Sequence, residues 1–424
     1  DDGEARRAKG LLWLPLLGVA LGTRAFGLPV PLADLALAAF CGLSLLLLGP
    51  RLRPGLPRWW PALVAFVACG LLSGLPPLFG GSHFSGEQFL RSAAKLLLYA
   101  AATLLVHAVA RRAGSGATAA RLRDAFALSG GIALVIYAAL SLGLPLPSGL
   151  ACGEHTDTCS ALYYERRWFG DSSPTGLQQD VFVRAQGLAS EPTRFGYLQA
   201  MALGLLVLGG AAPVGRGRVG LLLVAASALL SFALAPWALL LALALLALPH
   251  LREPRAARRA AGLAALLAAL LLALPPVRAG FEHAVLARLQ RLATGPQDSS
   301  AALRVVGSWR LATRLAAERP LTGVGLGNFD VAVAAWRDEF PERVFLEGEI
   351  QGWNALAHVL GTTGLLGAAA FLALLALALR GSPPRLALFA LSLFADGAVL
   401  SAPFWVFLAL YALPPPVDSS SQAR

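Results

Sequence analysis

The chain has 424 residues, of which 57% are hydrophobic and only 14% are charged, and its net charge is +11. A soluble domain carries about a quarter charged residues, so the composition excludes one or two soluble enzyme domains. It predicts an all-α fold, specifically a polytopic helical membrane protein. Nearly all the bases are arginine, and in such a protein their distribution reflects topology first, so no nucleic-acid partner is expected.

Apolar stretches long enough to cross a bilayer predict about twelve transmembrane spans. Their approximate limits are 11–28, 30–49, 61–79, 93–110, 125–146, 193–212, 219–234, 236–250, 260–277, 353–379, 386–400 and 402–413. With a cytoplasmic N-terminus, every short loop on the inner side is basic, including "PRLRPGLPRWW" and "RRAGSGATAARLRD". This positive-inside pattern predicts that both termini are cytoplasmic.

The same pattern divides the chain into five parts. A five-helix transmembrane part (1–146) precedes a periplasmic segment (147–192), and a four-helix transmembrane part (193–277) precedes a larger helical periplasmic segment (278–352). The last transmembrane helices and a cytoplasmic tail occupy 353–424. Because the periplasm is oxidising, Cys152 and Cys159 in "CGEHTDTC" predict a local disulfide, whereas Cys41 and Cys69 lie in spans and are predicted packing residues.

The second periplasmic segment contains a predicted amphipathic helix over 301–318. Its proposed apolar face consists of Val305, Trp309, Ala312 and Ala316, and its polar face of Arg304, Arg310, Arg314 and Glu318. Arginine in such number at a membrane surface suits phosphate groups, because the guanidinium fork gives bidentate hydrogen bonds and stays charged. Solvated loops that pair with nearby acids are the alternative.

Two stretches near the C-terminus resemble a known family. "ERPLTGVGLGNF", followed by "NALAHVLGTTGLLGAAAF", is similar to the signature of the O-antigen ligase / O-antigen polymerase superfamily. The resemblance implies a donor glycan linked to a polyprenyl diphosphate, and an acceptor hydroxyl on a glycan, lipid or protein. It also implies an active site on the periplasmic face of the bacterial inner membrane, with no metal or other cofactor.

Carried over by that resemblance, Arg184 and Arg304 match the two diphosphate-binding arginines. The family's usual catalytic base is a histidine, but Trp353 occupies its position here. Two candidate bases remain: His358, four residues and one helical turn after Asn354, and Glu191 in "LASEPTRF". Each has a structural alternative, since a lone helix histidine is often a packing residue and Glu191 can cap the helix that Pro192 begins.

Four further residues are candidate substrate-binding groups: Trp353, Asn354, Arg310 and Arg314. The Trp353 substitution and the Glu-Pro string favour an O-antigen or exopolysaccharide polymerase that inverts the donor linkage. The alternatives are an O-antigen ligase, a protein O-oligosaccharyltransferase or, from another class, a transporter or flippase of an anionic lipid-linked substrate. A polymerase would also be compatible with a partner that regulates chain length.

Overall fold

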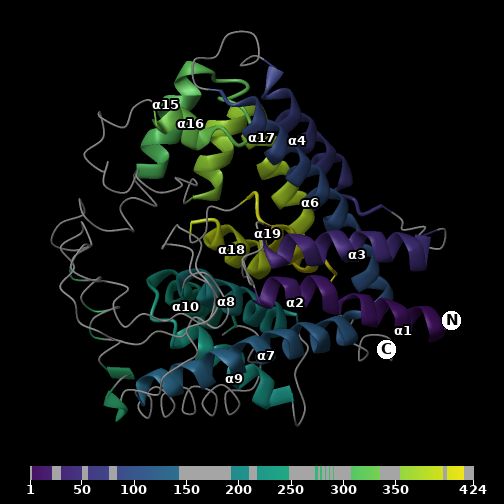
Figure 1. The fold of residues 1–424 in the computed structure, drawn as a ribbon, viewed down its shortest axis with the longest axis vertical. Helices are drawn as coiled ribbons and strands as arrows, with labels where there is room; N and C mark the ends of the chain where they lie inside the picture. Colours follow the sequence, from purple (N-terminus) through teal and green to yellow (C-terminus); the bar gives the residue numbers. More distant parts are fainter. Residues whose placement is uncertain are drawn as a thin grey trace. The chain divides into compact units, whose positions relative to one another are not determined.

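The computed structural model of the chain is built from helices. It describes residues 2–21, 30–49, 56–75, 84–142, 192–209, 217–247, 307–334, 354–394 and 399–414, with isolated positions between 273 and 290, and contains no strand within these residues. The helices are α1 (Asp2–Leu11), α2 (Trp13–Leu21), α3 (Leu32–Leu48), α4 (Trp60–Leu72), α6 (Gly86–Ala113), α7 (Ser115–Ser141), α8 (Pro192–Leu208), α9 (Gly217–Leu229), α10 (Leu234–Ala247), α15 (Ser308–Glu318), α16 (Phe329–Ala334), α17 (Ala355–Leu379), α18 (Pro383–Ser392) and α19 (Ala402–Tyr411) (Figure 1). The all-α prediction is thus confirmed for the described residues.

Three helices are long and apolar enough to cross a membrane: α6, residues Ser115–Ala139 of α7, and α17. The limits of α6 follow from its sequence, because Ser85 caps its start, with Oγ accepting from Gln88 N–H. Its end is fixed by Gly114, which has φ +87° and donates its N–H to Ala110 O. Arg111 and Arg112 in the last turn add favourable charge at the C-terminal end of the helix dipole.

A helix occupies most of each predicted span that the structure describes, but two predictions need correction. Residues 111–124, predicted as a loop on the inner side, are helical except at Gly114, because α6 extends to Ala113 and α7 begins at Ser115. The predicted span 353–379 is also not one regular helix, since α17 is interrupted at Gly364. The span 260–277 lies almost entirely outside the described residues.

Two compact units divide the chain. Unit 1 comprises residues 1–15, 37–114 and 295–414. Within it α17 packs against α4 and α15, while α6 packs against α19. Every residue of α19 is buried, as expected for a helix that is apolar on all sides. The rings of Phe371 and Phe404 stack with centroids 5.8 Å apart, and Phe66 meets Phe371 at 5.2 Å, so an aromatic cluster joins α4, α17 and α19.

Unit 2 comprises residues 16–36, 115–294 and 415–424. In its described part, α8 and α9 pack against each other and against α7, and α10 packs on α8. A glycine permits the close approach of α7 to α9, because a Cβ at Gly130 would lie 2.8 Å from Ser227 Oγ and 3.0 Å from Leu223 O. Close packing through small residues is typical of helices in membranes.

The interruption of α17 depends on Gly364. Its φ of +65° lies in the left-handed region, where a side chain is strained. A Cβ at this position would also lie 2.5 Å from the carbonyl carbon of Leu321. The break lies at the first glycine of "GLLG", so the sequence motif marks a backbone conformation that other residues would adopt only with strain.

The glycine turn, which we define as residues 320–328, fills this break. In a continuous helix the N–H groups of Leu365 and Leu366 would donate to the carbonyls of Gly361 and Thr362. Four other backbone hydrogen bonds replace those two: Leu365 N–H to Pro320 O (2.8 Å), Leu366 N–H to Leu321 O (3.3 Å), Val324 N–H to Gly361 O (3.1 Å) and Gly325 N–H to Thr362 O (3.0 Å). The broken helix therefore keeps all these backbone groups satisfied, as is usual for buried backbone groups.

The far end of the glycine turn joins two other helices of unit 1. Leu326 N–H donates to Ser73 Oγ (3.0 Å) at the end of α4. Ser85 N–H, at the start of α6, donates to Asn328 Oδ1 (2.7 Å). The glycine turn thus connects α4, α6 and α17 through hydrogen bonds to backbone and side-chain groups.

Replacing Asn328 by alanine is expected to cost about 1–3 kcal/mol of stability. Asn328 is fully buried, and its loss leaves both Ser85 N–H and Leu326 O, the acceptor from Asn328 Nδ2, without a partner. The thermal-unfolding midpoint checks this. The matched control is Thr313→Ala, an exposed residue whose hydroxyl bonds only to its own helix. Equal midpoints for the two variants would contradict the assigned role of Asn328.

Candidate functional site

Asn354 organises the start of α17. Its backbone is extended and its Oδ1 accepts from the N–H groups of Leu356 (3.0 Å) and Ala357 (3.1 Å). Ala355 N–H donates to Leu393 O (3.0 Å). The first backbone donors of the helix are therefore already used. A ligand at this helix end would have to be bound by side chains.

Two buried side-chain nitrogens at this end have no hydrogen-bond partner in the described part of the chain. One is Nδ2 of Asn354, which is fully buried; the other is Nδ1 of His358, which is 9% exposed. The His358 ring lies against Phe329 of α16, with centroids 5.3 Å apart and planes at 31°. Buried polar groups are normally hydrogen-bonded, so this pair, one helical turn apart, is a candidate place for a polar group of a ligand.

Helix α15 packs beside the first half of α17. Its buried side consists of Leu311, Ala312 and Leu315, which form a cluster with Phe329 and Ala357. The helix predicted over 301–318 is confirmed for 308–318, but the predicted apolar face is only partly right. The large leucines, which bury the most apolar surface, define the packed side, whereas Trp309 and Ala316 are not fully buried.

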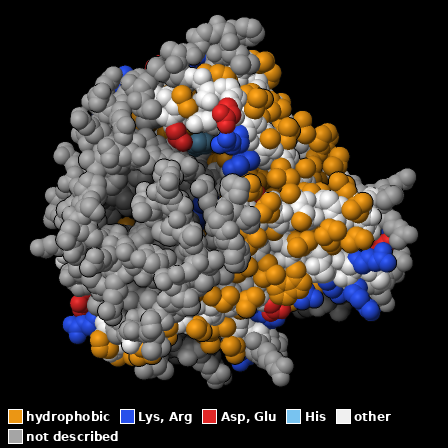
Figure 2. Space-filling view, viewed as in Figure 1, with side chains coloured by type: hydrophobic (Ala, Val, Ile, Leu, Met, Phe, Trp, Pro, Cys, Tyr) orange, Lys and Arg blue, Asp and Glu red, His pale blue; other side chains and the backbone are white. Residues whose placement is uncertain are grey.

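The arginines of α15 belong to unit 1, as does the start of α17. Arg310 is exposed and Arg314 is half-buried. In the space-filling view, acidic and basic side chains lie side by side over the upper ends of α6 and α15–α17 (Figure 2). The packing of α15 on α17 thus places two of the predicted substrate-binding residues on the helix next to Asn354 and His358.

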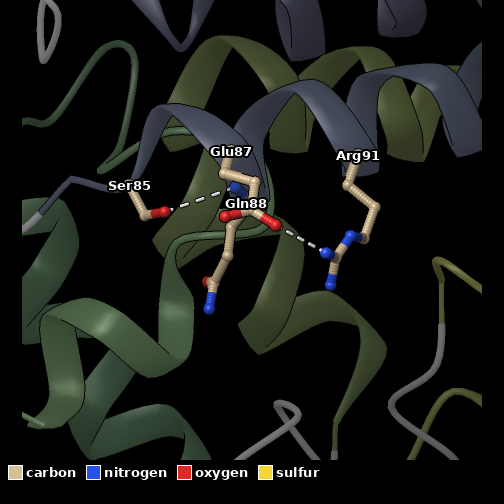
Figure 3. A network of polar contacts seen from close by, with 4 residues as sticks. All are labelled: Ser85, Glu87, Gln88 and Arg91. Carbon is tan, nitrogen blue, oxygen red and sulfur yellow. Dashed lines mark hydrogen bonds and ion pairs between the residues drawn. The ribbon is translucent and has the colours of Figure 1, made fainter.

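The N-terminal end of α6 carries a charged pair that sequence reasoning missed. Arg91 donates to Glu87 Oε1 (2.7 Å) one turn earlier, and both side chains are largely exposed (Figure 3). This end also borders the glycine turn, because a Cβ at Gly327 would lie 2.9 Å from Gln88 O. The sequence could have indicated this pair, because Arg91 lies just before the predicted span 93–110, on the predicted outer side.

Several predicted site residues lie outside the described part of the chain. They are Arg184, Glu191, Arg304 and Trp353, together with the cysteines Cys152 and Cys159. Of the predicted site, the structure describes Asn354 and His358 at the start of α17, and Arg310 and Arg314 on α15, which packs on α17. No group of three or more His, Cys, Asp or Glu side chains within the described ranges could hold a metal ion.

Comparison with known proteins adds no family assignment. No protein-family model matches the chain, and no curated protein matches it. The functional interpretation of these residues therefore depends on the sequence motifs and on the geometry at the start of α17.

Proposed function

We propose that the chain is a membrane glycosyltransferase that moves a polyprenyl-diphosphate-linked glycan to an acceptor hydroxyl. It would act on the periplasmic face of a bacterial inner membrane and without a metal. Among the activities of the superfamily, we place an O-antigen or exopolysaccharide polymerase first. The proposal includes about twelve spans with both termini in the cytoplasm. Residues 147–192 and 278–352 would then lie in the periplasm.

One observation supports the proposal best: the two stretches that carry the family resemblance are bonded to each other. The glycine turn belongs to the first stretch and the break at Gly364 to the second, and four backbone hydrogen bonds join them. Helix α15, which carries Arg310 and Arg314 and directly precedes the glycine turn, also packs on α17. The motif residues thus have a shared structural role, which is to position the segments that would bind donor and acceptor.

The chemistry we propose is a single inverting displacement. A base removes the proton from the acceptor hydroxyl, and the hydroxyl oxygen attacks the anomeric carbon of the donor. The bond from that carbon to the phosphate oxygen breaks, and the polyprenyl diphosphate leaves with both electrons of that bond. Arg184 and Arg304 would stabilise the developing negative charge, as fixed cations do for a leaving group.

His358 is our candidate for the base. With its proton on Nε2, its Nδ1 accepts a hydrogen bond, and this nitrogen has no partner in the described residues. Asn354 Nδ2, which also has no partner there, would donate a hydrogen bond to the acceptor and help to hold it in place. Glu191 remains the alternative base.

Within the superfamily, the residues favour a polymerase over a lipopolysaccharide ligase or a protein O-oligosaccharyltransferase. Tryptophan at 353 cannot take a proton, so the base of a ligase is missing from its usual position. The Glu-Pro string at 191–192 is similar to certain polymerases. In a polymerase the acceptor would be a second lipid-linked glycan.

A transporter or flippase is the second candidate, and the interruption of α17 favours it. Discontinuous helices often form the binding site of secondary transporters, where unwound backbone groups coordinate the substrate. In this chain the groups at the break already bond to the glycine turn. They are therefore not available to a solute, and we rank the transporter below the transferase.

The test is an assay of the purified chain with a polyprenyl-diphosphate oligosaccharide in chelator-treated buffer. Donor alone, donor with lipid A core, and donor with a protein acceptor are compared by product analysis. Longer lipid-linked glycans from donor alone would support the polymerase. Consumption only with lipid A core or protein would identify a ligase or protein transferase, and movement of an intact donor across a vesicle membrane would support the transporter.

A further inference from the structure

Helix α1 is held against the C-terminal end of α6 within unit 1. Ala8 and Leu11 of α1 are buried, and α1 packs on α6. An ion pair between Glu4 and Arg112 joins the two helices. The helix α1 therefore has a defined position beside one end of a helix that is long enough to span a membrane.

The exposed side of α1 and the C-terminal end of α6 form a basic surface, which we define as Arg6, Arg7, Lys9 and Arg111. Arg6, Arg7 and Arg111 are exposed and Lys9 is half-exposed. None of these four makes an ion pair within the described residues. The acids of α1 are Asp2 in its first turn and Glu4, which is paired with Arg112. Figure 2 shows basic side chains gathered over α1 near the N-terminus.

We propose that this basic surface binds the anionic headgroups of phospholipids in the leaflet at the C-terminal end of α6. Charge complementarity favours this partner, because cations beside a membrane span are attracted to anionic lipids. Trp13, half-buried at the junction of α1 and α2, is also a residue type enriched at the membrane interface. The proposal depends on α6 crossing a membrane and not on the transferase activity.

The position of α1 strengthens the argument. A basic segment on a loose tail would meet headgroups only part of the time, whereas α1 is packed and ion-paired beside α6. Its cations therefore lie close to the lipid surface without an additional ordering cost. Each such charge contributes about a fivefold gain in affinity for an anionic membrane.

The test uses the full purified chain, delipidated and titrated with phosphatidylglycerol or phosphatidylcholine, with bound lipid counted by native mass spectrometry. We expect wild type to retain phosphatidylglycerol in preference to phosphatidylcholine. The double variant Arg6→Gln/Arg7→Gln should bind phosphatidylglycerol roughly 30-fold more weakly. The matched control is Arg91→Gln, an exposed arginine at the other end of the same helix α6, which should leave this binding within about twofold of wild type.

Three results would overturn the proposal. One is equal retention of the two lipids by wild type, and another is an equal loss of phosphatidylglycerol in the double variant and the control. The third is displacement of the bound lipid by inorganic phosphate or by a short oligonucleotide, because the surface would then bind soluble polyanions. The unfolding midpoint of each variant is measured alongside, so that lost binding is distinguished from lost folding.

Discussion

Replacing Gly364 by alanine is expected to destabilise the protein by about 3–5 kcal/mol. Alanine would be strained at a φ of +65°, and its Cβ would lie 2.5 Å from Leu321 C and 2.6 Å from Thr322 N. Both contacts are with backbone, which cannot move aside as a side chain can. Relieving them would separate the glycine turn from α17 and break hydrogen bonds that join the two segments.

The sign of the stability change in Gly364→Ala distinguishes an interrupted α17 from a continuous one. If α17 were a continuous helix, Gly364→Ala would stabilise it by about 1 kcal/mol, because alanine is the better helix former. Gly131→Ala is the matched control, since Gly131 lies inside α7 and a Cβ at this position would meet nothing within 4 Å. The thermal-unfolding midpoint should fall for Gly364→Ala and stay level or rise for Gly131→Ala; a rise for both would contradict the break.

Replacing His358 by alanine is expected to lower the rate of glycan transfer by about 10²–10⁴-fold, the usual contribution of a general base. The buried Nδ1 of His358 has no hydrogen-bond partner in the described residues, and under the proposal the acceptor hydroxyl takes that place. The measurement is the single-turnover rate at saturating donor. A variant Glu191→Gln is assayed in parallel to compare the two candidate bases.

His107 gives a matched control for His358. It is also buried in unit 1, but its Nδ1 lies 3.2 Å from Ala409 O, and its ring meets Trp59 at 5.4 Å. Its polar contact is therefore structural. His107→Gln should affect stability and leave the rate per folded molecule within about twofold of wild type, well below the effect of a lost base. A full rate for His358→Ala together with a lost rate for Glu191→Gln would assign the base to Glu191.

Much of the helical architecture could be predicted from composition and apolar length. The helices α8 and α19 lie close to the predicted limits, because each is an apolar run with a proline in its first turn, at Pro192 and Pro403. The start of α7 could not be found this way. Residues 115–124 are polar enough to be predicted as a loop, yet they form the first turns of α7. Gly114, which ends α6, is the only residue between the two helices.

The glycine turn shows a different limit of sequence reasoning. Its glycines predict a tight turn, and Gly323, Gly325 and Gly327 do have positive φ. The insertion into α17 could not be predicted, because "GTTGLLG" has the composition of an ordinary packed helix. Which nitrogens of Asn354 and His358 stay unpaired depends on neighbours from α15, α16 and α18, and that information is in the tertiary packing.

The measurement that tests the central proposal most directly is the release of free polyprenyl diphosphate by the wild-type chain in the presence of a chelator. The proposal predicts that each new glycosidic linkage is accompanied by one released polyprenyl diphosphate. The variant Arg304→Ala should form neither product. The control variant Arg278→Ala, which changes an exposed arginine paired with Glu282, should form both. A donor that stays intact with every glycan, lipid and protein acceptor would contradict it.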